Sequence, residues 1–202
     1  MTEAATHAAG GTPGNASVRS GLSGRAPAVQ LGAVLAGTLV LTLSSYLVVP
    51  MVPVPVTMQT LAVTLVGALY GWRLGAITVL AWLAQAAIGL PVLAGGAGGL
   101  AHFAGPTGGY LAGFVLAAAL TGWLAERGWS GRRPVLAFAA MLAGNALCLV
   151  TGAAWLAVLI GPEKAVTLGV LPFLLGGLLK SALGAALLTG GGRLADRFRA
   201  GR

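Results

Sequence analysis

The segment MQTLAVTLVGALYG, residues 58–71, decides how many times this chain of 202 residues crosses a membrane. It is apolar but only 14 residues long, whereas a helix needs about 20 mostly apolar residues to span a bilayer. On length alone it is a short span, a re-entrant segment or a buried helix. Five longer apolar runs qualify as spans, and they cover roughly residues 29–49, 74–92, 110–126, 134–160 and 166–191.

The distribution of basic residues distinguishes five spans from six. If residues 58–71 cross the membrane, ten of the twelve Lys and Arg residues fall on one side and only Lys164 falls on the other. Such an excess marks the cytoplasmic side of membrane proteins, and five spans would scatter these charges. The sequence therefore predicts an all-α integral membrane protein with six transmembrane helices and both termini in the cytoplasm. The ten residues are Arg19, Arg25, Arg73, Arg127, Arg132, Arg133, Arg193, Arg197, Arg199 and Arg202.

Composition supports a membrane protein and argues against several other classes. Hydrophobic residues make up 57% of the chain and charged residues 8%, against roughly 25% charged residues in soluble domains. Four acidic residues argue against a catalytic carboxylate pair, and topology explains the net charge of +8 without a nucleic-acid partner. One cysteine and two histidines provide neither a disulfide nor a metal cluster. We expect no cofactor, and a location in the lipid bilayer of the bacterial cytoplasmic membrane.

Three parts of the chain differ in composition. Residues 1–27 are small, polar and interrupted by Gly and Pro, which is typical of a disordered tail. Residues 28–194 hold the apolar runs and form the predicted six-helix substrate-binding domain, and residues 195–202 form a short basic tail. Both tails are expected in the cytoplasm.

Two connections on the predicted outer side lack charged residues. Residues 50–60 are rich in proline, and residues 89–109 are rich in glycine. Irregular backbone at membrane depth is tolerated where it is buried in protein or lines a cavity. We therefore expect irregular outer loops that cap a pocket, although a pair of solvated connectors is the alternative. Polar side chains available to this pocket are Thr57, Gln59, His102, Thr107 and Tyr110.

Lys180 is an ionisable residue inside the last apolar run. It lies eight residues after Pro172, which places it about 12 Å along a helix with a rise of 1.5 Å per residue. A charge at that depth is costly and indicates a functional site that faces a cavity. The alternative is a lysine whose head group reaches the interface along its flexible side chain.

Other residues within the spans carry two readings each. The amides of Asn145 and Gln85 either hold helices together or line the pocket, and for Gln85 we expect the former. Trp155 suits an interfacial aromatic belt, and it could also stack on a ligand. Gly32, Ala33, Ala36 and Gly37 form two pairs of small residues spaced four apart. They predict close packing of another transmembrane helix, from this chain or from a separate subunit.

Three motifs together resemble those of the BioY family, the biotin-binding S components of energy-coupling factor (ECF) transporters. They are PVPVTMQTLAV at residues 53–63, GLPVLAGGAGGLAHFAGPTGGYLAGF at residues 89–114 and PFLLGGLLKSALGAAL at residues 172–187. The resemblance covers roughly residues 29–192. It implies a six-helix protein that captures biotin from outside under its first and third loops and carries it across by tilting in the membrane.

The same resemblance implies partners and site residues. Transport would be driven by a transmembrane coupling subunit and a pair of cytosolic ATPases, docked on the small residues Gly32, Ala33, Ala36 and Gly37. Some members of the family are thought to work without the full assembly. The residues that we expect to bind substrate are Lys180, Gln59, Thr57, Tyr110, Asn145, Gly98 and Gly99.

One position departs from the family pattern. The family usually has an aspartate three residues before the lysine, and Gly177 occupies that place here. Lys180 then lacks a carboxylate neighbour and should accept an anionic ligand more readily, while one acceptor for the ureido N–H groups of biotin is lost. Asn145, Gln59 or loop carbonyls could replace that acceptor. We expect Lys180 to meet the carboxylate of the ligand, and the ureido carbonyl is the alternative.

Three rival functions remain on sequence alone. A self-sufficient transporter of biotin or another small carboxylate would work without ATPase partners. A membrane-embedded enzyme would need a nucleophile with a base or a metal, and the sequence shows no such set and no ATPase motif of its own. A subunit that serves only for assembly would bind no ligand, which the buried lysine argues against.

Overall fold

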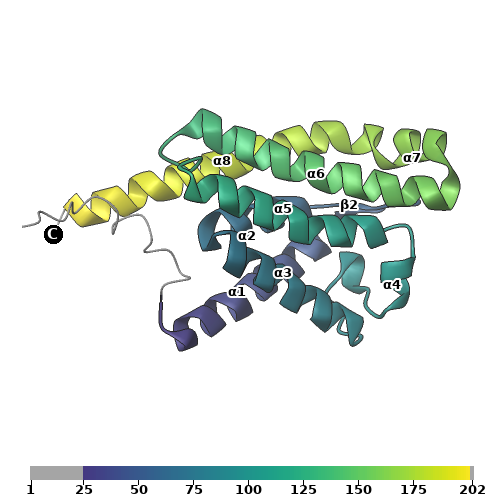
Figure 1. Ribbon diagram of the computed structural model, residues 1–202, viewed down its shortest axis with the longest axis horizontal. Coiled ribbons are helices and arrows are strands. Elements are labelled where there is room, and N and C mark those ends of the chain that lie inside the picture. Colours follow the sequence, from purple (N-terminus) through teal and green to yellow (C-terminus); the bar gives the residue numbers. More distant parts are fainter. Residues whose placement is uncertain (1–24, 201–202) are drawn as a thin grey trace, which may run out of the picture.

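A computed structural model describes residues 25–200, and this part of the chain is mostly helical (Figure 1). A hairpin of two short strands and several short helical turns connect six longer helices. The longer helices are α1 (Pro27–Tyr46), α2 (Gln59–Tyr70), α3 (Trp72–Ala87), α5 (Gly108–Glu126), α6 (Pro134–Ile160) and α8 (Leu171–Ala200). The shorter elements are β1 (Val48–Val49), β2 (Val56–Thr57), η2 (Ala94–Gly96), α4 (Ala101–Ala104) and α7 (Pro162–Gly169).

Four of the described helices are long and apolar enough to cross a membrane, namely α1, α5, α6 and the Leu171–Leu194 part of α8. The segment 58–71 forms α2, an apolar helix of 12 residues. Gly71, with φ +81°, ends α2 and leads directly into α3, a conformation that glycine adopts without strain. Figure 1 shows that α2 and α3 lie side by side as a hairpin of two short helices.

Helices α5 and α6 pack closely because small residues line their contact. A side chain at Gly113 would meet Thr151, and one at Gly152 would meet the ring of Tyr110. On the other side of α5, a side chain at Gly67 of α2 would meet the backbone of Ala118. Small residues let helix backbones approach closely, and this substitutes for a hydrophobic driving force in lipid.

Two boundaries differ from the sequence prediction. The predicted span 166–191 is interrupted, because α7 ends at Gly169 and α8 begins at Leu171. Pro172 explains the break, since a proline ring cannot follow an intact helical turn. The predicted span 74–92 corresponds to α3, which already ends at Ala87 because Gly89 takes φ +97°.

The outer connections were expected to be irregular, and this is correct only in part. The connection between α1 and α2 contains an antiparallel hairpin in which Val48 pairs with Thr57. The connection between α3 and α5 contains η2 and α4. In Figure 1, β2, α4 and α7 lie toward the right-hand end of the molecule, and the last turns of α8 extend to the left-hand end. The two loops therefore meet at one end of the helical bundle.

Candidate functional site

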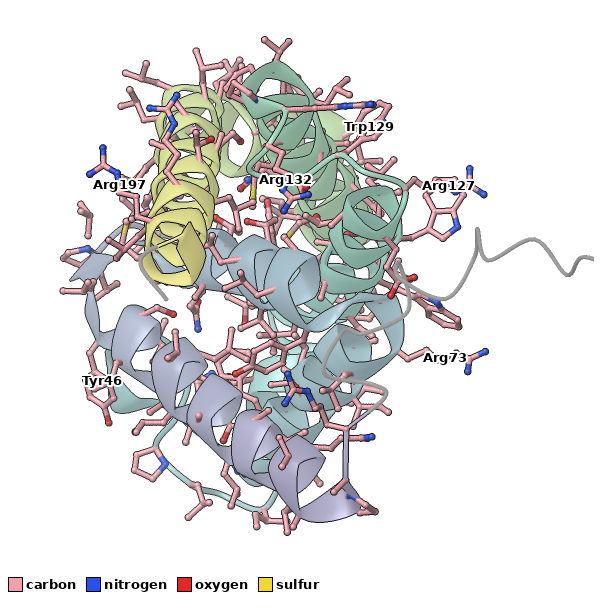
Figure 2. The ribbon with its side chains drawn as sticks, turned by 90° about the vertical axis from the view of Figure 1, so that its left-hand side faces the viewer. Tyr46, Arg73, Arg127, Trp129, Arg132 and Arg197 are labelled. Carbon is pink, nitrogen blue, oxygen red and sulfur yellow. The ribbon has the colours of Figure 1, made fainter. Side chains whose placement is uncertain are left out.

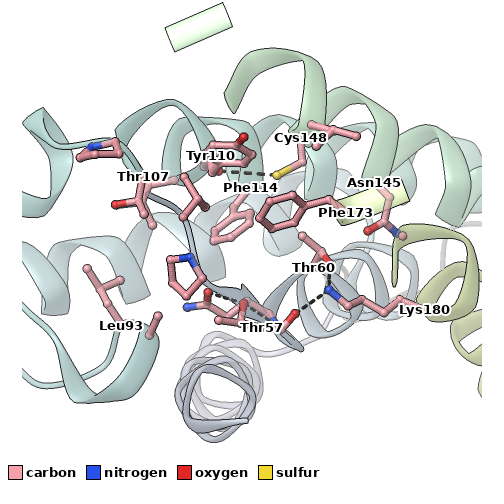
Figure 3. A pocket seen from close by; sticks show the side chains of 18 of the residues that line it. Thr57, Thr60, Leu93, Thr107, Tyr110, Phe114, Asn145, Cys148, Phe173 and Lys180 are labelled. Carbon is pink, nitrogen blue, oxygen red and sulfur yellow. Dashed lines mark hydrogen bonds between the residues drawn. The ribbon is translucent and has the colours of Figure 1, made fainter. Parts of the chain in front are cut away.

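The helices and both outer connections border a cavity of about 510 Å³ (Figure 3). Residues from β2, α2, α4, α5, α6 and α8 line it, together with the loop before η2. Pockets for small ligands commonly have volumes of about 300–1,000 Å³. The position under the hairpin and α4 agrees with the expectation that these connections cap a pocket.

Most of the cavity wall is apolar. Phe114, Leu111 and Leu149 contribute from α5 and α6, and Leu93 contributes from the loop before η2. The rings of Tyr110 and Phe173 stack with centroids 6.0 Å apart, and the Tyr110 hydroxyl donates to the carbonyl oxygen of Gly169 at 2.7 Å. Tyr110 thus holds the α7–α8 break against α5 while its ring lines the cavity.

Lys180 provides the only lysine or arginine side chain among the described residues of the cavity wall. Its side chain is 8% exposed, and Nζ donates to the carbonyl oxygen of Thr57 at 2.5 Å and to Oγ1 of Thr60 at 3.2 Å. These bonds join α8 to the start of α2, and Figure 3 shows them as dashed lines. No acidic side chain is among the described residues that line the cavity, so the ammonium group has neutral neighbours.

Gln59 presents a hydrogen-bond donor. Its Oε1 accepts from Oγ1 of Thr57 at 2.7 Å, which leaves the Nε2 amide group as the free end of the side chain. The residue lines the cavity and is 5% exposed, and Nε2 is buried without a partner. A buried amide N–H without a partner is costly. A ligand acceptor in the cavity would remove that cost.

Asn145 presents the complementary acceptor. Its Nδ2 donates to the carbonyl oxygen of Met141 at 3.0 Å and to Oγ of Ser181 at 3.1 Å. Because the Met141 carbonyl can only accept, and Ser181 Oγ donates to the carbonyl oxygen of Gly177 at 2.7 Å, the orientation of the amide is fixed. Oδ1 is then the atom that can accept a donor from a ligand. Asn145 therefore both joins α6 to α8 and lines the cavity.

Not all of the residues expected at the site reach the cavity. Thr57, Gln59, Tyr110, Asn145, Lys180, His102 and Thr107 line it. Gly98 and Gly99 do not, because the Gly99 N–H donates to the carbonyl oxygen of Ala86 at 2.7 Å and a side chain at Gly98 would meet the carbonyl oxygen of Leu90. These two glycines shape the loop. Their expected contact with substrate has no support in this arrangement.

Trp155 and Gln85 also lie outside the cavity lining. Nε1 of Trp155 donates to the carbonyl oxygen of Gly105 at 2.9 Å, so this ring supports the loop after α4. Gln85 is partly buried on α3. Thr60, Phe114, Cys148 and Phe173 line the cavity as well, although they were not expected there from the sequence. Phe173 had a signal, since it precedes Lys180 by seven residues and therefore shares its helix face.

The small residues of α1 do not form one surface. Gly32 and Ala36 are exposed and Ala33 is partly exposed. Gly37 is buried, and a side chain there would meet Thr78 and Tyr70. Gly37 therefore serves the contact between α1 and the α2–α3 hairpin, whereas Gly32 and Ala36 remain available to a neighbouring helix.

Fold and cavity together define a multi-pass helical membrane protein with a largely apolar cavity of the size that holds a small ligand. The sequence profile of the BioY family matches residues 17–197. The chain is 43% identical to the biotin transporter BioY of Rhizobium etli over 144 residues, which are 67% of this chain and 76% of that one. It is 39% identical to the probable biotin transporter BioY of Pyrococcus horikoshii over 130 residues, 64% of this chain and 75% of that one. The chain belongs to the BioY family.

A solved structure has the same arrangement of helices. It is the S-component for biotin from an ECF-type ABC transporter, and it covers 83% of this chain and 90% of its own length. The TM-score is 0.73 at 28% sequence identity. This likeness agrees with the family resemblance drawn from the three sequence motifs.

Proposed function

We propose that this protein captures biotin and serves as the substrate-specific subunit of an ECF transporter. The observation that carries the proposal is the cavity of about 510 Å³ with one buried cation, in a chain of the BioY family. The cavity is a binding site rather than a catalytic one. Its polar atoms are already arranged to receive a ligand with both hydrogen-bond acceptors and donors.

The chemistry of biotin matches these atoms. Its apolar bicycle suits the wall of Phe114, Phe173 and leucine side chains. The carboxylate suits Lys180, because charge-assisted hydrogen bonds are about twice as strong as neutral ones. The ureido carbonyl can accept from Nε2 of Gln59, and a ureido N–H can donate to Oδ1 of Asn145. This assignment uses Asn145 in place of the missing carboxylate at Gly177.

Six spans with both termini in the cytoplasm are the topology we propose. The hairpin of α2 and α3 supports it, because two short helices joined at Gly71 enter and leave from the same end. Arg73 follows the α2–α3 turn, Arg127 and Arg132 lie in the α5–α6 connection and Arg197 lies in the last turns of α8. These parts lie toward the left-hand end of the molecule in Figure 1, and Figure 2, which looks at that end, shows their side chains. Lys164 lies on α7 at the right-hand end. We assign the arginine-rich end to the cytoplasmic side of the cytoplasmic membrane.

A transmembrane coupling subunit and two cytosolic ATPases are the partners that we propose. The exposed part of α1 around Gly32 and Ala36 is the proposed docking surface, since small residues allow a partner helix to approach. Residues 28–194 form the proposed substrate-binding domain. The proposed tail at residues 1–27 lies mostly outside the described part of the chain, and residues 195–202 form the second proposed tail.

Biotin binding to the detergent-purified full chain tests the proposal. Titration calorimetry with biotin, lipoate and thiamine should give tight binding of biotin only. Lipoate shares the carboxylate but lacks the ureido group, and thiamine is a cation that Lys180 should repel. Equal binding of biotin and lipoate, or no binding of biotin by folded protein, would contradict biotin as the substrate.

The need for partners is tested separately. Uptake of labelled biotin into proteoliposomes should require the coupling subunit, both ATPases and ATP. Uptake by this chain alone, at the rate of the full assembly, would replace the proposed subunit with a self-sufficient transporter. The binding measurement would remain valid in that case.

A further inference from the structure

Two hydroxyl groups at the end of α1 contact the connection between α3 and α5. Oγ of Ser45 lies 2.8 Å from the carbonyl oxygen of Val92 and 3.1 Å from that of Leu93. The hydroxyl of Tyr46 donates to the carbonyl oxygen of Pro91 at 2.7 Å. Three consecutive carbonyl groups of this connection therefore lie against hydroxyls of α1.

The segment that these hydroxyls contact, residues 91–97, forms part of the cavity wall, and we call it the wall loop. Leu93 and Ala97 line the cavity, and Figure 3 shows the Leu93 side chain among those that border it. Neither Ser45 nor Tyr46 is among the described residues that line the cavity. Their hydroxyls therefore act on the wall loop rather than on a ligand.

The ring of Tyr46 contacts the wall loop at a second point. A side chain at Gly96 would meet the hydroxyl oxygen of Tyr46 at 3.3 Å and a ring carbon at 3.4 Å. Gly96 has φ +81°, a conformation that glycine adopts without strain. Because the hydroxyl bonds to Pro91 while the ring covers Gly96, Tyr46 holds the loop near both of its ends.

The contact made by Ser45 can break and re-form at low cost. Its hydroxyl has a single hydrogen to donate, and the carbonyl oxygen of Thr42 within α1 is a further acceptor at 2.6 Å. Ser45 is 0% exposed, and a buried hydroxyl without an acceptor is costly. When the wall loop moves away, Thr42 can accept the hydrogen, so no buried donor is left without a partner.

The other connection over the cavity is held to the same end of α1 by backbone groups. The Met58 N–H donates to the carbonyl oxygen of Leu47 at 3.1 Å, and Val48 pairs with Thr57 in the hairpin. Side-chain substitutions leave these bonds in place. The wall loop is therefore the connection that changes at the hydroxyls of α1 would release.

We propose that Ser45 and Tyr46 are positioning residues that hold the wall loop against α1 and set the rate at which ligand enters and leaves the cavity. The inference rests on the proposed function, in which this ligand is biotin. Loss of a hydroxyl raises the fraction of molecules in which the loop has moved away, and exchange scales with that fraction. Association and dissociation should therefore accelerate together, and their ratio should stay nearly constant.

Rates of binding and release of labelled biotin by the detergent-purified full chain test the proposal. Ser45→Ala should raise both rates about fivefold, the factor that corresponds to one neutral hydrogen bond, and Tyr46→Phe should act in the same direction. The dissociation constant should change less than about twofold. Ser44→Ala is the matched control and should change neither rate, because the Ser44 hydroxyl donates to the carbonyl oxygen of Leu41 in its own helix at 2.7 Å.

Cys148 provides a second readout that needs no biotin. It is the sole cysteine of the chain, lines the cavity and is 2% exposed. A charged methanethiosulfonate reagent added from water should label it faster when the wall loop opens more often. Ser45→Ala should therefore be labelled about fivefold faster than the wild type, and Ser44→Ala at the rate of the wild type. Tyr46→Phe, at an exposed side chain, provides the same test if Ser45→Ala fails to fold.

The two readouts separate this proposal from the identity of the ligand. Labelling of Cys148 at the wild-type rate in Ser45→Ala and Tyr46→Phe would overturn the role of the hydroxyls, whether or not biotin binds. Faster release of biotin with unchanged association would also overturn it, because these residues would then only shape the wall. Faster labelling in a chain that binds no biotin would support the role of the hydroxyls and contradict biotin as the ligand.

Discussion

The cation in the cavity and the arginines at the opposite end of the bundle carry the same formal charge in contrasting surroundings. Lys180 is buried among neutral groups and bonds to Thr57 and Thr60. Arg73 and Arg127 are exposed and stack on tryptophan rings. Water and aromatic faces stabilise the arginines, whereas the lysine lacks a counter-charge until an anion enters. We propose that burial converts a charge that could orient a membrane protein into one that selects a ligand.

The largest expected effect follows removal of the buried cation. Lys180→Met should weaken biotin binding about 10- to 150-fold, because a hydrogen bond to a charged group contributes about 1.5–3 kcal/mol. Its thermal unfolding temperature should not fall, because the cost of burying a charge disappears as well. Titration calorimetry and thermal unfolding measure the two effects.

The other lysine of the chain provides the control. Lys164 is exposed on α7, so Lys164→Met removes an equal charge without altering the cavity and should leave biotin affinity unchanged. Equal losses in both variants would show that Lys180 acts only through the general field of the protein. The comparison between buried and exposed cations would then fail.

The group of biotin that meets Lys180 can be identified by combining variant and ligand. Biotinamide, which lacks the carboxylate charge, should bind the wild type about tenfold or more weakly than biotin. In Lys180→Met, the two ligands should bind equally, because the partner of the carboxylate is gone. A tenfold difference that persists in the variant would instead assign Lys180 to the ureido carbonyl.

The sequence predicts the depth of Lys180 but not what it contacts. Its depth follows from helix rise and the position of Pro172. Its partner Thr57 lies 123 residues earlier, and only the packing of α8 on α2 brings the two together. The family resemblance drawn from sequence motifs covers roughly residues 29–192, which is most of the range 17–197 that the family profile matches. The fold class therefore follows from sequence, whereas individual contacts require the packed helices.

In glycine-rich segments, the sequence carries little information about individual contacts. Composition indicates that residues 89–109 bend, but it does not say which backbone groups face the cavity. Gly98 and Gly99 turn out to support the loop through Leu90 and Ala86. The amide of Asn145 had two open readings, and the structure agrees with both, because Nδ2 donates to Met141 and Ser181 while the residue also lines the cavity.

A carboxylate at position 177 should reduce the difference between the buried lysine and the exposed arginines, because it would give Lys180 a stabilising partner. A side chain there meets open space, and residues three apart on a helix are neighbours. The carboxylate introduced by Gly177→Asp would pair with Lys180, so the preference for biotin over biotinamide should fall about threefold or more. The ratio of the two dissociation constants measures this. An unchanged ratio would mean that the added carboxylate does not reach the lysine.

Salt should have little effect on the buried cation. Raising the salt concentration from 0.1 M to 1 M shortens the Debye length from about 10 Å to about 3 Å, and buried pairs are screened much less than exposed ones. Biotin affinity should therefore change less than about twofold over this range. A several-fold loss of biotin affinity at 1 M salt would place Lys180 in contact with bulk water.

The smallest effect is expected where an arginine is exposed. Arg127→Gln removes the guanidinium stacked on Trp123, an interaction that contributes about 0.5–1 kcal/mol at exposed sites. Thermal unfolding should therefore shift by only a few degrees or less, with biotin affinity unchanged. Arg73→Gln is the matched comparison, because its guanidinium carbon is farther from the ring, at 5.0 Å, and its loss should matter less. A fall in biotin affinity in either variant would show that the exposed end of the bundle is coupled to the cavity, since neither arginine lines it.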